Sequence, residues 1–147
     1  MTVLFSDVEE AAKQHGDDIL HTQCCLSHPL TQCTGIKVYV KYENRQHTGA
    51  FKVRGTLTRL LTLSEEQKIT GVVSVSAGNH AQGVAYNAKR LGIPATIVMP
   101  DSTPFTKVRN TTNLGANVVI EGATLNEAAQ HAEILASTQN LAFIHPF

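Results

Sequence analysis

The sequence predicts an α/β fold: an open parallel sheet with helices on both faces. From residue 71 onward, short apolar runs rich in β-branched residues alternate with longer segments whose apolar residues recur at helical spacing. The connections between these segments are short. Strand–helix alternation of this kind is typical of βαβ units, and right-handed crossovers then make the sheet parallel.

Before residue 71 the pattern is less regular. Ser6 and Glu9 form a capping-box pattern and Gly16 is a stop signal, so we expect a short N-terminal helix between them. Residues 37–43 alternate apolar and polar side chains and predict a strand. A helix is expected over residues 51–63. Its apolar residues at helical spacing are Val53, Leu57, Leu60 and Leu61.

The regular part should contain four strands and three helices. The strands are expected at 71–76, 95–100, 117–122 and 141–147. The helices are expected at 79–92, 104–115 and 124–140. Gly92 and Gly115 are typical helix stops, and Pro104 suits a first turn. One face of the first of these helices should be apolar, through Ala81, Val84, Ala85, Ala88 and Leu91.

Composition limits the class of partner. The 147 residues suffice for one average domain, and 12 basic against 12 acidic residues leave no net charge. We therefore expect neither nucleic acid nor an anionic membrane surface as a partner. The apolar runs fall short of the ~18 residues that span a bilayer, and the N-terminus lacks a signal-peptide pattern. Cys24, Cys25 and Cys33 show no C-x-x-C spacing, which favours reduced thiols in a cytoplasmic protein and no metal site.

The stretch SAGNH, Ser76–His80, stands between a predicted strand and a predicted helix. Ligands of open parallel sheets bind at the carboxyl ends of strands, and a helix N-terminus suits a carboxylate or phosphate. Ser76 and Asn79 would add side-chain hydrogen bonds, and Gly78 would let the backbone come close. The same residues also suit an ordinary capped turn, and His80 is more typical of a structural residue. Nucleotide-binding glycine patterns are absent, so a nicotinamide cofactor is not expected.

Lys52 stands in the stretch HTGAFKVRG, at the beginning of a predicted helix. Its spacing fits either a solvated surface lysine or an activated amine. The positive helix end disfavours a cation, and Phe51 could desolvate the side chain; both would favour the free amine, which forms Schiff bases with aldehydes. Thr48, Gly49 and Ala50 are small enough to let a flat ring approach. The residues allow a lysine–aldehyde cofactor site without requiring one.

Three stretches, in order, carry a resemblance to a known family: KYENRQHTGAFKVRG, SAGNHAQGVAYNAKRLGIPATIVMP and TPFTKVRNTTNLGANVV. They resemble the pyridoxal-phosphate enzymes of fold type II, above all the threonine/serine dehydratases (ammonia-lyases) and their relative serine racemase. The resemblance runs from about residue 19 to the C-terminus. It implies pyridoxal 5'-phosphate as cofactor. It also implies that residues 1–48 belong to an incomplete large domain and residues 49–147 form the small α/β domain, with the chain ending where the large domain would resume.

The resemblance assigns roles by position. Lys52 would form the Schiff base with the cofactor and take the α-proton of the substrate. Phe51 would support the cofactor, and Asn79 would contact the 3'-oxygen of its ring. The residues expected to receive the substrate carboxylate are Ser76, Ala77, Gly78, Asn79 and His80.

The implied reaction removes the α-proton of L-threonine or L-serine, eliminates the β-hydroxyl and ends in a 2-oxo acid and ammonia. Serine racemases resemble this sequence but carry at position 77 a serine that protonates the opposite face, so Ala77 favours dehydration. Sister activities remain alternatives: serine racemase, 3-hydroxyaspartate dehydratase, threonine synthase and cysteine synthase-like enzymes. The full-length enzyme is expected to be a homo-oligomer.

Some features depart from the family pattern. Gln23 stands where proline is expected, and Ala50 where serine is common. In the family, the phosphate-binding glycine-rich loop, the partner of the pyridine nitrogen and the divalent-metal ligands lie past residue 147. We therefore expect these residues alone to bind the cofactor weakly and to be inactive. The alternative class is a non-catalytic protein, either truncated or one half of a split enzyme.

Overall fold

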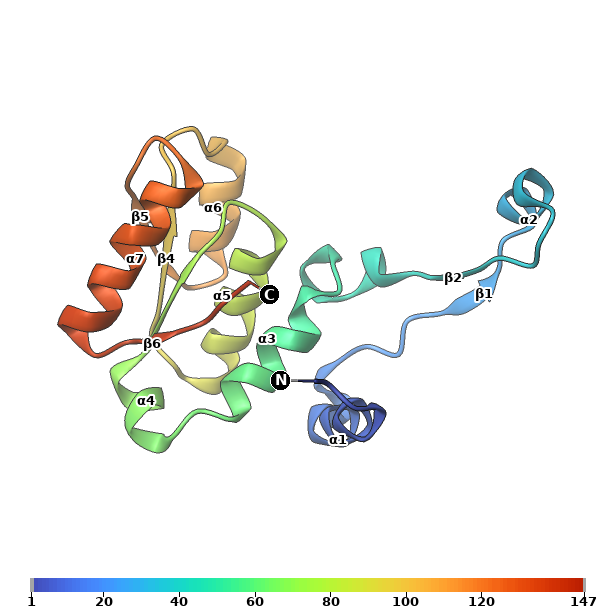
Figure 1. Cartoon of the computed structure of the whole chain (residues 1–147), viewed down its shortest axis with the longest axis horizontal. Helices are drawn as coiled ribbons and strands as arrows, with labels where there is room; N and C mark the ends of the chain where they lie inside the picture. Colours follow the sequence, from blue (N-terminus) through green and yellow to red (C-terminus); the bar gives the residue numbers. More distant parts are fainter. Residues whose placement is uncertain (1, 147) are drawn as a thin grey trace.

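The centre of the molecule is a four-stranded sheet (Figure 1), and the computed structural model describes residues 2–146. The strands lie in the order β5-β4-β3-β6, and every neighbouring pair is parallel. Their bounds are β3 Val72–Val75, β4 Ala95–Met99, β5 Asn117–Ile120 and β6 Ala142–Phe143. The parallel sheet predicted from the alternating pattern is confirmed.

Helices cover both faces of this sheet, as predicted (Figure 1). On one face α5 packs through Ala81, Val84, Ala85 and Ala88 in a core with Val72, Ile97 and Met99. On the other face α7 packs through Ala128 and Ala132 against Val73, Val75 and Val98. Neighbouring strand residues thus serve opposite faces, because side chains alternate along a strand. The helices are α1 Phe5–His15, α2 His28–Thr34, α3 Lys52–Leu61, α4 Glu65–Thr70, α5 Asn79–Leu91, α6 Phe105–Asn113 and α7 Leu125–Gln139.

A separate two-stranded antiparallel sheet pairs β1 (Cys24–Leu26) with β2 (Tyr39–Lys41), and α2 lies between these strands in sequence. This arm reaches away from the parallel sheet (Figure 1). Its three cysteines are exposed and free, and α2 has no buried residue. Of the strand predicted at residues 37–43, only the middle, Tyr39–Lys41, forms a strand. The division of the chain at residue 48 stays a prediction.

Polar contacts tie the base of the arm to α3. Arg54 makes two hydrogen bonds to the carboxylate of Glu43, at 2.8 and 2.9 Å. The side-chain amide of Gln46 exchanges two hydrogen bonds with the backbone of Leu20. Ile19 is buried nearby, in a small core with Val53 and Leu57 of α3. These contacts fix the segment that leads into α3.

Several local predictions were wrong. The N-terminal helix starts at Phe5, and the Asp7 carboxylate accepts the Leu4 N–H, so Ser6 is no cap. Leu91 is exposed rather than buried, because it is the last residue of α5. The last strand was expected to run to the C-terminus but ends at Phe143; residue 147 lies outside the described residues. The sequence also gave no signal that we recognised for β1, α2 and α4.

No helix among residues 2–146 has the length and apolar content needed to cross a membrane.

Candidate functional site

Lys52 is the first residue of α3, as the sequence predicted. The chain reaches it through a 3₁₀ turn, His47–Gly49, in which Thr48 has φ 61° and Gly49 has φ 70°. Two successive left-handed residues turn the backbone sharply, and the first costs about 1–2 kcal/mol because threonine has a branched Cβ. Ala50 is buried directly after the turn. The small residues before Lys52 therefore form a tight entry into α3.

The backbone of Lys52 is held against α5. Thr56 Oγ1 donates to the Lys52 carbonyl at 3.1 Å, and the buried Asn87 amide donates to Thr56 Oγ1 at 2.8 Å. The same amide donates to the Val53 carbonyl at 2.8 Å. Gly83 faces this network: a Cβ there would lie 3.3 Å from the carbonyl carbon of Lys52. The absence of a side chain at Gly83 lets α3 and α5 come this close.

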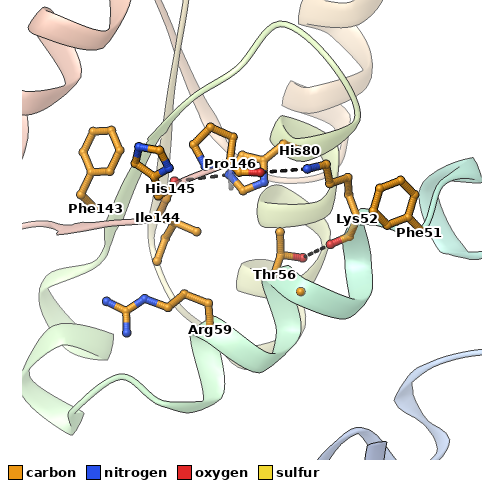
Figure 2. A pocket seen from close by; sticks show the side chains of 10 residues that line it. Phe51, Lys52, Thr56, Arg59, His80, Phe143, Ile144, His145 and Pro146 are labelled. Carbon is orange, nitrogen blue, oxygen red and sulfur yellow. Dashed lines mark hydrogen bonds between the residues drawn. The ribbon is translucent and has the colours of Figure 1, made fainter. Parts of the chain in front are cut away.

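The amine of Lys52 points toward the segment that follows β6 (Figure 2). Its Nζ donates to the carbonyl oxygen of Pro146 at 2.8 Å. It also lies 5.5 Å from the centre of the Phe51 ring. Phe51 is 59% exposed, so the ring flanks the amine without burying it. The expected neighbour relation is present, but desolvation by this ring is weaker than the sequence suggested.

A cavity of about 480 Å³ lies beside the amine, within the size range of small-molecule sites. It brings together the first turns of α3 and α5 and the segment after β6. Of the predicted site residues, Lys52, Phe51 and His80 line it, whereas Ser76, Ala77, Gly78 and Asn79 are not among its lining residues. The lining residues are Phe51, Lys52, Gly55, Thr56, Arg59, His80, Phe143, Ile144, His145 and Pro146.

The loop between β3 and α5 is where the substrate carboxylate was predicted to bind. Ser76 N donates to the Val98 carbonyl at 3.2 Å, and Ser76 Oγ accepts the Gly78 N–H at 3.2 Å. Asn79 is exposed as the first residue of α5. The loop therefore stands at the carboxyl end of β3 and at a helix N-terminus, which is the placement that suits an anion. Its contact with a carboxylate stays a prediction.

His80 is 6% exposed, and its side chain turns inward. Its Nε2 lies 3.0 Å from Ser74 Oγ and 3.3 Å from the Ile144 carbonyl oxygen. Burial lowers the pKa of His80, and the nearby charges of Lys52 and His145 lower it further. Only the backbone of His80 remains available for the predicted carboxylate contact, because the ring serves a structural network.

Sequence reasoning missed the other residues that line the cavity, among them four with polar side chains or a carbonyl that faces Lys52: Thr56, Arg59, His145 and Pro146. Helical spacing could have found the first two, which lie one and two turns after Lys52 on the same face. The last two follow β6, and only the strand order shows that β6 lies beside β3.

These residues fit a small aldehyde cofactor. An amine opens onto a cavity of suitable volume, a ring flanks the amine, and the N-terminus of α5 supplies a partial positive charge. Residues 2–146 contain no cluster of three or more His, Cys, Asp or Glu side chains able to hold a metal ion.

The chain is similar in sequence to proteins of a known family. A family model described as "Pyridoxal-phosphate dependent enzyme" matches residues 16–147. The L-threonine ammonia-lyase of Thermotoga maritima is 43% identical over 145 residues, which cover 99% of this chain and 36% of that protein. The catabolic L-threonine dehydratase TdcB of Staphylococcus aureus N315 is 44% identical over 146 residues, 99% of this chain and 42% of that protein.

Two solved structures resemble the chain closely. The processed threonine deaminase isoform 2 of Solanum lycopersicum superposes with a TM-score of 0.90 at 37% identity, covering 97% of this chain and 42% of that one. The serine racemase of Dictyostelium discoideum gives 0.91 at 33% identity, covering 100% and 48%. The chain thus spans less than half the length of each of these relatives.

Proposed function

Because the chain belongs to the family of pyridoxal-phosphate-dependent enzymes, we propose that it carries the Schiff-base lysine of a threonine/serine dehydratase. The observation that carries the proposal is the position of Lys52. Its amine opens onto a cavity where the first turns of α3 and α5 and the segment after β6 meet. The relatives named threonine ammonia-lyase and threonine dehydratase support this substrate class.

Each residue has a separate task in the proposed reaction. Lys52 holds the cofactor through its amine and, once released, accepts the α-proton of the substrate at Nζ. Phe51 flanks the ring of the cofactor, and Asn79 contacts it from the first turn of α5. The loop Ser76–His80 receives the substrate carboxylate, with the N–H groups at the N-terminus of α5 as donors, because the N–H groups of Ser76 and Gly78 are engaged within the protein. When bound, pyridoxal phosphate supplies the electron sink that makes the α-proton acidic.

Racemisation of serine is the second candidate, because the chain also resembles a serine racemase. A racemase needs a proton donor on each face of the α-carbon. Ala77 has no proton to give, and the side chain of His80 faces Ser74 and Ile144. Both observations favour dehydration. Chiral analysis of serine incubated with the full-length enzyme separates the alternatives: dehydration yields pyruvate and ammonia, whereas racemisation yields D-serine.

The lysine assignment has a direct test. Borohydride reduction of the full-length enzyme with pyridoxal phosphate, followed by peptide mapping, should place the label on Lys52. The Lys52→Arg variant keeps the charge and should lose the label, while Lys68→Arg should keep it, because the half-exposed Lys68 lies on α4 and pairs with Glu65. A label on another lysine, or no label on the wild-type protein, would refute the assignment.

A further inference from the structure

The segment after β6 is fastened to β3 through Ile144, whose N–H donates to the Val73 carbonyl oxygen at 2.8 Å and whose carbonyl oxygen lies against two side chains. The Ile144 carbonyl oxygen accepts a hydrogen bond from Ser74 Oγ at 2.6 Å, and His80 Nε2 lies 3.3 Å from the same oxygen. Ser74 is fully buried and His80 is nearly so. These polar groups have lost their contact with water, so their hydrogen bonds to each other hold the segment in place.

The geometry also fixes which atoms donate. The hydroxyl of Ser74 has one proton, and a carbonyl can only accept, so that proton points to Ile144. The Ser74 oxygen is then free to accept, and His80 Nε2 lies 3.0 Å from it. His80 therefore carries its proton on Nε2. One imidazole N–H serves both the serine oxygen and the carbonyl oxygen.

The fastened segment ends in the carbonyl that receives the Lys52 amine. Pro146 follows Ile144 by two residues, and its carbonyl oxygen accepts from Lys52 Nζ at 2.8 Å (Figure 2). We propose that Ser74 and His80 act as positioning residues for Lys52: they hold the Ile144 carbonyl, and the segment 144–146 in turn holds the lysine amine.

A flexible lysine side chain needs a hydrogen-bond partner to stay in one rotamer. Its four-carbon stem has many rotamers, and holding it in one costs about 1.5–2 kcal/mol of conformational entropy. The Pro146 carbonyl offsets part of that cost and aims Nζ into the cavity. The consequence for capture of the cofactor rests on the proposed function, whereas the hydrogen-bonded arrangement of Ser74, His80 and the segment 144–146 does not.

The test measures the reactivity of Lys52 in the cofactor-free protein. Trace acetylation with acetic anhydride, read by mass spectrometry, gives the rate at Lys52 relative to the exposed Lys13. Ser74→Ala and His80→Phe remove a hydrogen bond to the segment, and we expect each to raise the relative rate about fivefold, the factor that corresponds to one hydrogen bond of about 1 kcal/mol. His80→Gln keeps an N–H donor near the Nε2 position and should stay near the wild-type rate.

Three results would overturn the proposal: an unchanged rate in both Ser74→Ala and His80→Phe, a rise in His80→Gln equal to that in His80→Phe, or a parallel rise at Lys41 and Lys68. The last would mean a general loosening of the fold. The proposed function is tested separately, because the borohydride label requires pyridoxal phosphate and the acetylation does not. If the wild-type protein takes no label but the acetylation pattern holds, the function fails and the positioning stands.

Discussion

Replacing Gly83 by alanine should destabilise the protein and displace Lys52, although alanine favours helices. Gly83 lies inside α5, where it faces α3. A Cβ there would lie 3.2 Å from Thr56 Oγ1, and 3.3 and 3.4 Å from the carbonyl carbon and oxygen of Lys52. Two of these atoms are backbone, and Thr56 is held by Asn87, so the neighbours cannot rotate away. The two helices must separate by a few tenths of an ångström.

The size of the effect follows from two opposing terms. Alanine in a helix interior gains about 1 kcal/mol over glycine. Overpacking of a well-packed contact costs about 1–3 kcal/mol. Gly83→Ala should therefore lose up to about 2 kcal/mol. Gly55→Ala is the matched control: Gly55 lies inside α3 with nothing within 4 Å of the added Cβ, so it should gain about 0.5–1 kcal/mol.

Urea unfolding followed by circular dichroism gives the free energy of unfolding of both variants. We expect them to differ by about 0.5–3 kcal/mol, with Gly55→Ala the more stable. Equal stabilities would refute the reasoning, because the close approach of α3 and α5 would then carry no cost. The structure also predicts that Gly83→Ala lowers borohydride labelling of Lys52, since its backbone moves with the first turn of α3.

Two further predictions concern pH. Hydrogen bonds from Arg54, and then from Thr22, lower the pKa of Glu43 from its ordinary 4.5 to about 2. The contribution of ionised Glu43 to the free energy of unfolding is therefore fully present above pH 4.5 and is lost as the pH falls toward 2. The pKa difference between the unfolded and folded states sets an upper bound of about 3 kcal/mol on this contribution. Arg54 is 35% exposed, so solvent screening reduces the expected loss in Glu43→Gln to about 1–2 kcal/mol at pH 7; an equal loss at pH 2 would contradict it. Burial lowers the pKa of His15 and His80 below 6.5. As the pH falls, the unfolded state binds protons at these histidines before the folded state does. The free energy of unfolding should therefore fall below pH 6.5, by at most about 1.4 kcal/mol per pH unit for each histidine. Urea unfolding at several pH values should show a weaker pH dependence in His15→Gln than in the wild-type protein.

The sequence predicted the parallel sheet well because the signals there are local. β3 is buried along its whole length, and its sequence is a run of valines interrupted only by Ser74. α5 is bounded by a polar loop and by Gly92, which adopts φ 69°. Such segments carry their own pattern, and the fold only has to bring them together.

Elements with weaker patterns were missed for identifiable reasons. α4 has six residues, five of them polar, and no buried side chain, so no apolar periodicity marks it. β1 has three residues with mostly exposed side chains. The last strand was overextended because residues 141–147 are apolar apart from His145. Beyond Phe143, the carbonyl of Ile144 bonds to Ser74 Oγ rather than to a strand partner.

The candidate site likewise has parts that the sequence predicted and a part that it did not. The two stretches that contain Lys52 and Ser76–His80 could be recognised in the sequence, since each lies at a helix N-terminus. The third contributor could not, because Pro146 is 94 positions from Lys52. Its place depends on a choice of topology: β6 joins the sheet beside β3, not beside β5.

That choice of topology also explains why the cavity lies where it does. From β3 the chain adds β4 and then β5 on one side, and β6 returns to the other side of β3. The helix that follows β3 and the helix that precedes β6 cover opposite faces. A crevice therefore opens at the carboxyl ends of β3 and β6, where such a reversal places ligand sites in open sheets. Lys52 reaches this crevice because Gly83 lets α3 lie close to α5, and the segment after β6 reaches it because β6 is short. The chain leaves the sheet after Phe143, and three residues later the Pro146 carbonyl accepts the Lys52 amine, so the early end of the strand is part of the site.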